Sequence, residues 1–326
     1  MEQGKICEVC KGRVALILML ILMWALCANA AAEKLTVSYN PMPLNVPSIV
    51  MKEMGFLEEA MAELGIKVEY NSFLAGYQMT EAMAAGELDI APVMGGTSTV
   101  TSFAGGRSLQ VFAAYGQAPA GFAIVAKAGS PMHSVQDLKG KTVGLPVGTE
   151  VHYLLGKALE EDGLSLQDVQ VANMLVPDAV TALMAGHIEA AGVVEPVLSR
   201  LQSAGQIKVL RDGVGLMPGL TVMTARKGII DERPEVLQAF LKAHNRSLQY
   251  MAENPEETVE LVAKETDLPP ELVKKIMAKY TFAPQITPEL AASLANTAAF
   301  LYEVGIIRER VELEELINYS ILESIR

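Results

Sequence analysis

The sequence predicts an α/β protein with two lobes, in which two sheets rich in parallel strands are joined by two extended crossings. Three observations predict this fold. Strand-like and helix-like segments alternate from Lys34 onward, the same order occurs twice, and the last third of the chain is helical. Alternation of this kind is typical of parallel sheets whose faces are covered by the connecting helices.

The first alternating run starts at Lys34. Its strands are short, apolar stretches, and its helices carry apolar residues three and four positions apart. We expect strand, helix, strand, helix and strand at residues 34–40, 46–65, 67–73, 78–87 and 88–94.

The second run repeats this order. We expect strand, helix, strand, helix and strand at residues 141–145, 150–163, 169–175, 179–186 and 187–194. At a constant offset, Ala85-Gly86 aligns with Ala185-Gly186, and Asp89 aligns with Glu189. A repeat inside the same order of elements indicates two lobes of similar topology.

Two apolar, β-prone segments, 121–127 and 218–228, are expected to cross between the lobes. The expected division places residues 31–123 and 221–326 in lobe 1 and residues 124–220 in lobe 2. A chain that crosses twice leaves a cleft between its lobes.

The C-terminal third shows apolar stripes of helical period, and several of its helices start near a proline, which suits a first helical turn. The expected helices are 233–254, 255–265, 269–280, 287–305 and 311–325.

Residues 1–30 have the pattern of a signal peptide: a basic start, an apolar core at 14–27 and small residues at 28–30. We expect this leader to be cleaved and the protein to be periplasmic; the alternative is an uncleaved anchor. All three cysteines of the chain lie in the leader, which leaves none for a disulfide or thiol chemistry in the mature protein.

The charge balance is acidic, with 26 Lys and Arg against 38 Asp and Glu, a net charge of −12. This argues against a nucleic-acid partner, which would need a basic face. A small anion is not excluded, because its site is local.

Four strand-to-helix turns are candidates for a ligand site, because ligands bind at the carboxyl ends of parallel strands. They lie at residues 40–48, 73–80, 93–100 and 145–152. Backbone N–H groups at a helix start attract anions, small residues allow close approach, and hydroxyls add hydrogen bonds. Ordinary helix capping remains the alternative for each turn. The candidate residues are Asn45, Gly76, Tyr77, Gln78, Gly95, Gly96, Thr97, Ser98, Gly148 and Thr149.

Three further residues are candidates because of their charge or titration. Glu150 and Glu195 are the carboxylates nearest the expected cleft, although an acid at position 150 also complements its own helix dipole. His152 lies in the first turn after Gly148-Thr149, where it either reaches a ligand or packs and caps.

Catalytic and cofactor signatures are missing from the sequence. Ser98 lacks a GxSxG setting, the four histidines are scattered without metal-ligand spacing, and there is no GxGxxG or P-loop. We therefore expect no enzyme activity, no metal and no cofactor.

Three segments resemble a known family: "FLAGYQMTEAMAAGELDIAPVMGGTSTVTSFAGG", "VQDLKGKTVGLPVGTEVHYLLGKALEEDGL" and "VPDAVTALMAGHIEAAGVVEP". They are similar to substrate-binding proteins of ABC importers for aliphatic sulfonates, nitrate and taurine, and the resemblance covers roughly residues 34–248. It implies a type II periplasmic binding protein fold that closes on a solute by hinge motion. It also implies an inner-membrane ABC permease as partner, and we expect a monomer.

The resemblance assigns ligand contacts to residues 76–78, 95–97 and 148–149 and maps its carboxylate region onto Glu195. No Arg or Lys falls in the four turns, and Glu150 and Glu195 would disfavour an anion unless they point away. A neutral or cationic heterocycle, such as a pyrimidine precursor of thiamine, therefore stays an alternative to the anion. A ligand sensor for a membrane receptor is a further alternative.

Overall fold

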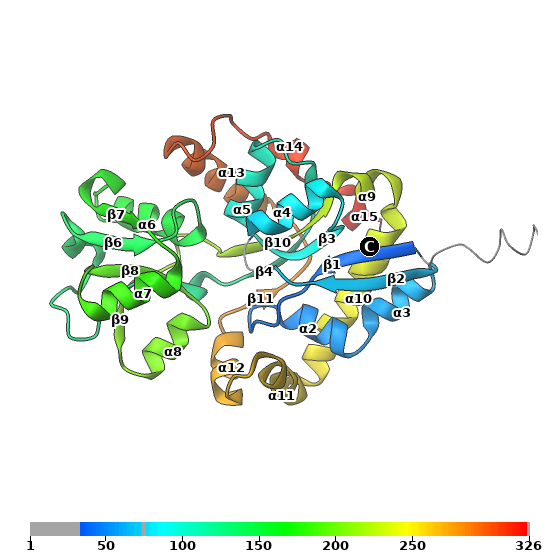
Figure 1. Ribbon diagram of the computed structural model, residues 1–326, viewed down its shortest axis with the longest axis horizontal. Coiled ribbons are helices and arrows are strands. Elements are labelled where there is room, and N and C mark those ends of the chain that lie inside the picture. The colour runs from blue at the N-terminus through cyan, green and yellow to red at the C-terminus, as the bar shows by residue number, and fades with distance from the viewer. Residues whose placement is uncertain (1–32, 74–75, 325–326) are drawn as a thin grey trace, which may run out of the picture.

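The computed structural model describes residues 33–73 and 76–324 and contains two sheets (Figure 1). The expected signal peptide lies outside the described residues. The six-stranded sheet has the order β11-β4-β10-β3-β1-β2, and the five-stranded sheet has the order β7-β6-β8-β5-β9.

The strands of the first sheet are β1 (Glu33–Ser38), β2 (Ile66–Asn71), β3 (Ile90–Gly95), β4 (Leu109–Gln117), β10 (Leu220–Arg226) and β11 (Thr281–Phe282). Those of the second sheet are β5 (Phe122–Lys127), β6 (Thr142–Leu145), β7 (Gln170–Asn173), β8 (Ala190–Val194) and β9 (Ile207–Asp212). The α/β fold with two sheets is confirmed.

Each sheet is mixed, because the two segments expected to cross between lobes are antiparallel strands. Strand β5 pairs with β8 and β9 in the second sheet, and β10 pairs with β3 and β4 in the first. The chain passes between the sheets next to these strands, at 118–121 and 213–219. There the two passes are joined, since the Ala118 N–H donates to the Pro218 carbonyl at 3.0 Å.

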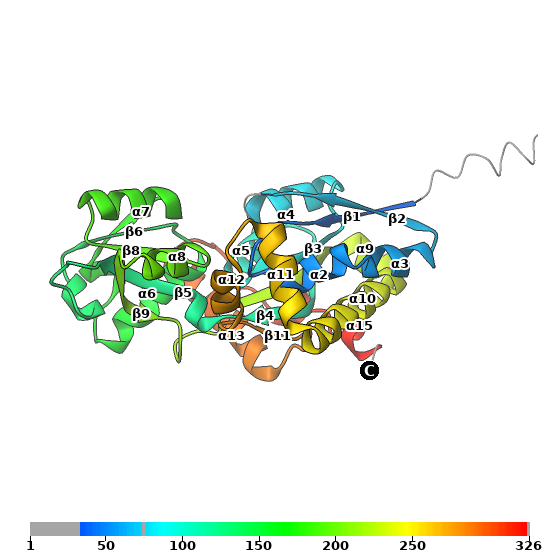
Figure 2. The ribbon, with the colours of Figure 1, turned by 90° about the horizontal axis from the view of Figure 1, so that it is seen from below.

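Helices cover both sheets and fill the C-terminal third (Figures 1 and 2). Before β9 they are α2 (Val46–Glu53), α3 (Phe56–Ala62), α4 (Gly76–Ala85), α5 (Gly96–Ala104), α6 (Glu150–Glu161), α7 (Val176–Ala185) and α8 (Val197–Ser203). Further along lie α9 (Lys227–Glu232), α10 (Pro234–Glu253), α11 (Pro255–Thr266), α12 (Pro270–Met277), α13 (Pro288–Glu303), α14 (Leu313–Leu316) and α15 (Ser320–Glu323). Helices α10 to α13 each begin at a proline, as the sequence predicts.

Two helix predictions were wrong in extent. The single helix expected at 46–65 is interrupted at Gly55, whose φ of 70° ends α2 and starts α3. The helix expected at 311–325 consists of two short helices, because Ile317 forms a β-bridge with Val111 between them. A local backbone conformation interrupts the first helix, and a tertiary contact interrupts the second.

The internal repeat has a physical counterpart at the start of β3 and β8. Gly86 and Gly186 end α4 and α7 in the left-handed region, with φ of 75° and 77°. The Asp89 carboxylate then accepts the Thr36 N–H at 2.8 Å, and the Glu189 carboxylate accepts the Thr142 N–H at 3.0 Å. The aligned acidic residues thus satisfy the backbone of the neighbouring parallel strand in each sheet.

A buried polar cluster lies between the first sheet and its helices. The Tyr115 hydroxyl accepts the Ser48 N–H at 3.1 Å, and the Tyr115 ring lies 5.4 Å from that of His244. His244 is fully buried, and neither ring nitrogen has a partner among the described residues. Desolvation lowers the pKa of His244 to about 3.

This depressed pKa predicts acid sensitivity. The unfolded chain takes up a proton near pH 6.5, whereas folded His244 stays neutral until about pH 3, so stability is lost as pH falls through this window. Between pH 7 and pH 5 the group alone is expected to remove about 2 kcal/mol of unfolding free energy. Urea unfolding at the two pH values should show a smaller loss for His244→Leu than for the wild type. Substitution of the exposed His187 is the control, and equal losses in His244→Leu and wild type would contradict the expectation.

Candidate functional site between the two sheets

The start of α5 is the centre of the candidate site. The residues that we call the α5 start are Gly95, which ends β3 and is the N-cap of α5, and the first two helical residues, Gly96 and Thr97. The helix has no side-chain cap. The first turn of a helix carries N–H groups that lack intrahelical partners and a partial positive charge. The Thr97 N–H donates to Oε1 of Glu150 at 3.0 Å. Glu150 is the first residue of α6, so this hydrogen bond joins the two parts of the molecule.

Gly95 allows the carboxylate to approach. A Cβ atom at this position would lie 2.5 Å from Oε1 and 3.2 Å from Oε2 of Glu150. The absence of a side chain therefore leaves room for one anionic group directly at the α5 start.

The space that remains beside this contact is small. A cavity of about 20 Å³ lies there, room for about one water molecule. Its lining comes from the α5 start, α6, the second pass between the sheets and α13: Gly96, Thr97, Glu150, Tyr153, Met217, Pro218, Gly219, Leu220, Ser293, Leu294 and Thr297. A solute larger than water could therefore bind here only if Glu150 moved away or if the two sheets lay further apart.

The turn at residues 76–78 lies beside α5. A Cβ at Gly76 would be 2.8 Å from the Ser98 Oγ, so the start of α4 touches the first turn of α5. The Tyr77 side chain is 62% exposed and offers an aromatic face at this edge. Gln78 follows on the same helix.

Asn45 is the N-cap residue of α2. Its Nδ2 donates to the Asn40 carbonyl at 2.7 Å, while its buried Oδ1 has no partner within residues 33–73 and 76–324. Asn40 in turn accepts the Ser72 hydroxyl at 2.6 Å and the Phe73 N–H at 3.2 Å. Sequence reasoning did not single out Asn40. Its hydrogen bonds connect the turn at residues 40–48 with the end of the segment that precedes α4.

The turn at Gly148 and Thr149 is largely occupied by its own contacts. The Thr149 hydroxyl donates to the Pro146 carbonyl at 2.6 Å, and Ile306 covers Gly148. Thr149 thus closes its turn with the hydroxyl that was expected to face a ligand. The part of this turn that reaches the α5 start is Glu150.

His152 packs against Phe300 and caps the backbone at Gly148. Its Nδ1 accepts the Gly148 N–H at 3.2 Å, and its ring meets the edge of Phe300 at 5.3 Å between centroids. Burial lowers the pKa of His152. Of the two roles left open for this residue, the structure shows the packing and capping one.

Glu195 is buried, and its carboxylate interacts with two residues. Its carboxylate accepts the Ser199 N–H at 3.1 Å and the Ser199 hydroxyl at 2.8 Å, and it forms an ion pair with Lys279. Lys279 follows α12, which packs against α8 from the other side of the interface (Figure 2). The carboxylate that was expected to face a cleft is thus paired with Lys279. No local pattern announces it, because the partners are 84 positions apart.

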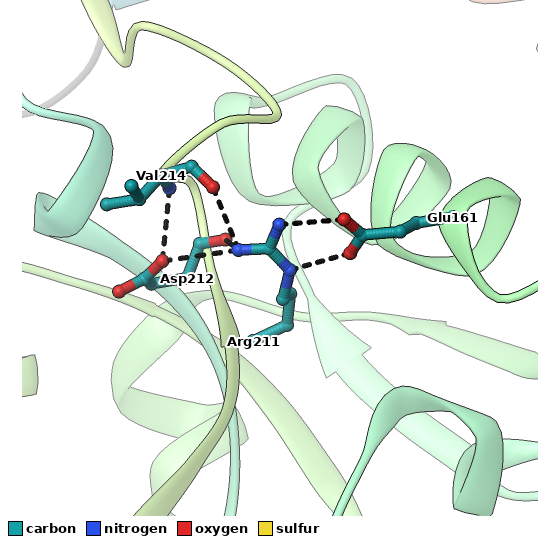
Figure 3. A network of polar contacts seen from close by, with 4 residues as sticks. All are labelled: Glu161, Arg211, Asp212 and Val214. Atoms are coloured by element: carbon teal, nitrogen blue, oxygen red, sulfur yellow. Dashed lines mark hydrogen bonds and ion pairs between the residues drawn. The ribbon is translucent and has the colours of Figure 1, made fainter.

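The far end of α6 is held by a second ion pair, shown in Figure 3. The Arg211 guanidinium binds both Glu161 oxygens, at 2.7 and 3.0 Å. It also donates to the Val214 carbonyl at 2.9 Å, at the beginning of the second pass between the sheets. The helix that carries Glu150 is thereby tied to the segment that returns to the first sheet.

The described part of the chain lacks two further features. It contains no group of three or more His, Cys, Asp or Glu side chains placed to hold a metal ion. Nor does it contain a helix that is long and apolar enough to cross a membrane.

Two mixed α/β sheets connected twice, with helix starts meeting between them, define the periplasmic binding protein fold. The family model described as "NMT1/THI5 like" matches residues 44–258, and the chain belongs to this family of solute-binding proteins.

Three similar proteins support the assignment. The crystal structure of the periplasmic aliphatic sulphonate binding protein from Escherichia coli has a TM-score of 0.79 and 26% identity, covering 88% of this chain and 92% of that one. The taurine-binding periplasmic protein of Escherichia coli (strain K12) is 26% identical over 293 residues, 85% of this chain and 88% of the relative. For the fold alone, an alkanesulfonate-binding protein from Xanthomonas axonopodis pv. citri, bound to MOPS, has a TM-score of 0.77 at 23% identity, covering 89% of this chain and 100% of that one.

The Glu195–Lys279 pair leads to a stability prediction. Lys279→Met would leave a buried carboxylate without its countercharge and is expected to reduce the unfolding free energy by about 3 kcal/mol. Adding Glu195→Gln to that variant should restore most of the loss, because no charge then stays buried. Denaturant unfolding measures both effects, with substitution of the exposed Lys274 by Met as control. A Lys279→Met protein as stable as the control would contradict the assignment.

Proposed function

We propose that this chain is the exported, non-catalytic binding component of an ABC importer, and that it captures a small sulfonate-like anion between its lobes. Its leader directs it to the periplasm, where it acts as a monomer and delivers the solute to an inner-membrane permease. Hinge motion at the two passes between the sheets opens and closes the site.

The observation that carries this proposal is the carboxylate at the α5 start. An anionic oxygen on the Thr97 N–H is the arrangement that a sulfonate oxygen would make there. The positive end of the helix and the missing side chain at Gly95 favour a compact anion without an Arg or Lys. The sulfonate- and taurine-binding relatives support the same ligand class.

The alternative of a neutral or cationic heterocycle is less well supported. It relied on two free carboxylates in the cleft, and Glu195 is occupied by Lys279 and Ser199. Glu150 is the one carboxylate of that pair which touches the site.

Binding is tested by calorimetric titration of the mature protein with taurine, ethanesulfonate and nitrate. At least one should release or absorb heat and raise the melting temperature, because a ligand that binds only the folded state stabilises it. Absence of both signals with all three would contradict the proposed ligand class.

Gly95→Ala tests the location of the site. The added methyl group would fill the space where the anion's oxygen lies, so affinity for the bound sulfonate is expected to fall at least ~10-fold. The backbone at Gly95 is extended, with φ of −63°, which alanine adopts without strain. Gly129→Ala is the matched control, because a Cβ there meets nothing within 4 Å. Equal affinity of the two variants would place the ligand elsewhere.

A further inference from the structure

Glu150 and the proposed ligand require the same position. The carboxylate already accepts the Thr97 N–H at 3.0 Å and lies within 3.2 Å of a Cβ built at Gly95. With about 20 Å³ of free volume beside it, the α5 start has no room for a sulfonate while Glu150 stays. The two groups are also alike in charge and would repel each other at this distance.

The carboxylate satisfies the α5 start incompletely. The Thr97 hydroxyl is on the same residue, which is 1% exposed, and it has no hydrogen-bond partner in the described part of the protein. An unpaired buried hydroxyl is unfavourable. A sulfonate has three oxygens and can accept from more than one donor, which gives it an advantage over the carboxylate once it has entered.

We infer that Glu150 is a specificity-determining residue, which competes with the ligand anion for the α5 start and disfavours ligands whose only charge is negative. The inference rests on the proposed function. A simple alkanesulfonate must displace the carboxylate and then bind beside it. An aminosulfonate carries an ammonium group that attracts the displaced carboxylate, so it meets a smaller penalty.

The test compares ethanesulfonate with taurine, which differ by the amino group. Calorimetric titration of Glu150→Ala is expected to show about 10-fold tighter ethanesulfonate binding than wild type, with a smaller gain or a loss for taurine. Glu150→Gln, which keeps the shape and removes the charge, should shift the preference in the same direction. Glu63→Ala is the control, because it changes the net charge equally at the exposed end of α3.

The outcomes are distinguishable. Unchanged or weaker ethanesulfonate binding in both Glu150 variants, or an equal gain for the two ligands, would overturn the inference and leave the proposed function standing. If neither ligand binds wild type or any variant, the proposed sulfonate function fails and the inference fails with it. Circular dichroism melts of the variants confirm that the folded state is being titrated.

Discussion

The unpaired N–H groups at the start of α5 are the constraint on which the site depends. A helix that begins between the two sheets needs acceptors for these donors, and its dipole favours a negatively charged acceptor. Glu150 supplies that acceptor from α6 across the interface. Gly95 must lack a side chain for this to happen, and the contact in turn reduces the cavity to about the size of one water molecule.

A second interface contact follows from a different constraint, the desolvation of a carboxylate. Glu195 is fully buried, and a buried charge needs both a countercharge and hydrogen bonds. Ser199 of α8 donates hydrogen bonds to the Glu195 carboxylate. The countercharge comes from Lys279, in the C-terminal segment. The two acidic residues nearest the cleft therefore have different roles: Glu195 holds the interface together, and Glu150 touches the candidate site.

Local sequence patterns predicted much of the fold, whereas contacts distant in sequence decided the site. The strand–helix alternation and the proline-started helices express short-range backbone requirements and were predicted, but the strands β4 and β9 were not. The repeat at Asp89 and Glu189 was visible in the sequence, although their carboxylates bind Thr36 and Thr142, which lie 53 and 47 positions away. A helix start after Gly95-Gly96 was expected from these small residues. The partners of Glu195, the role of Asn40 and the closure of Thr149 on Pro146 follow from tertiary packing or from a side-chain rotamer, which periodicity does not encode.

The charge balance of the interface also bears on the proposed anionic ligand, because the candidate turns of this acidic protein contain no basic residue. Pairing with Lys279 neutralises the Glu195 charge, so it does not oppose a ligand at the α5 start. Of the Glu195 and Glu150 carboxylates, that of Glu150 is the one that contacts the α5 start. Glu150 is the first residue of α6, where the dipole of α6 also stabilises its negative charge. A carboxylate displaced from the Thr97 N–H would keep its interaction with the dipole of its own helix. That interaction limits the free-energy cost of replacing the Glu150 carboxylate with the proposed ligand anion.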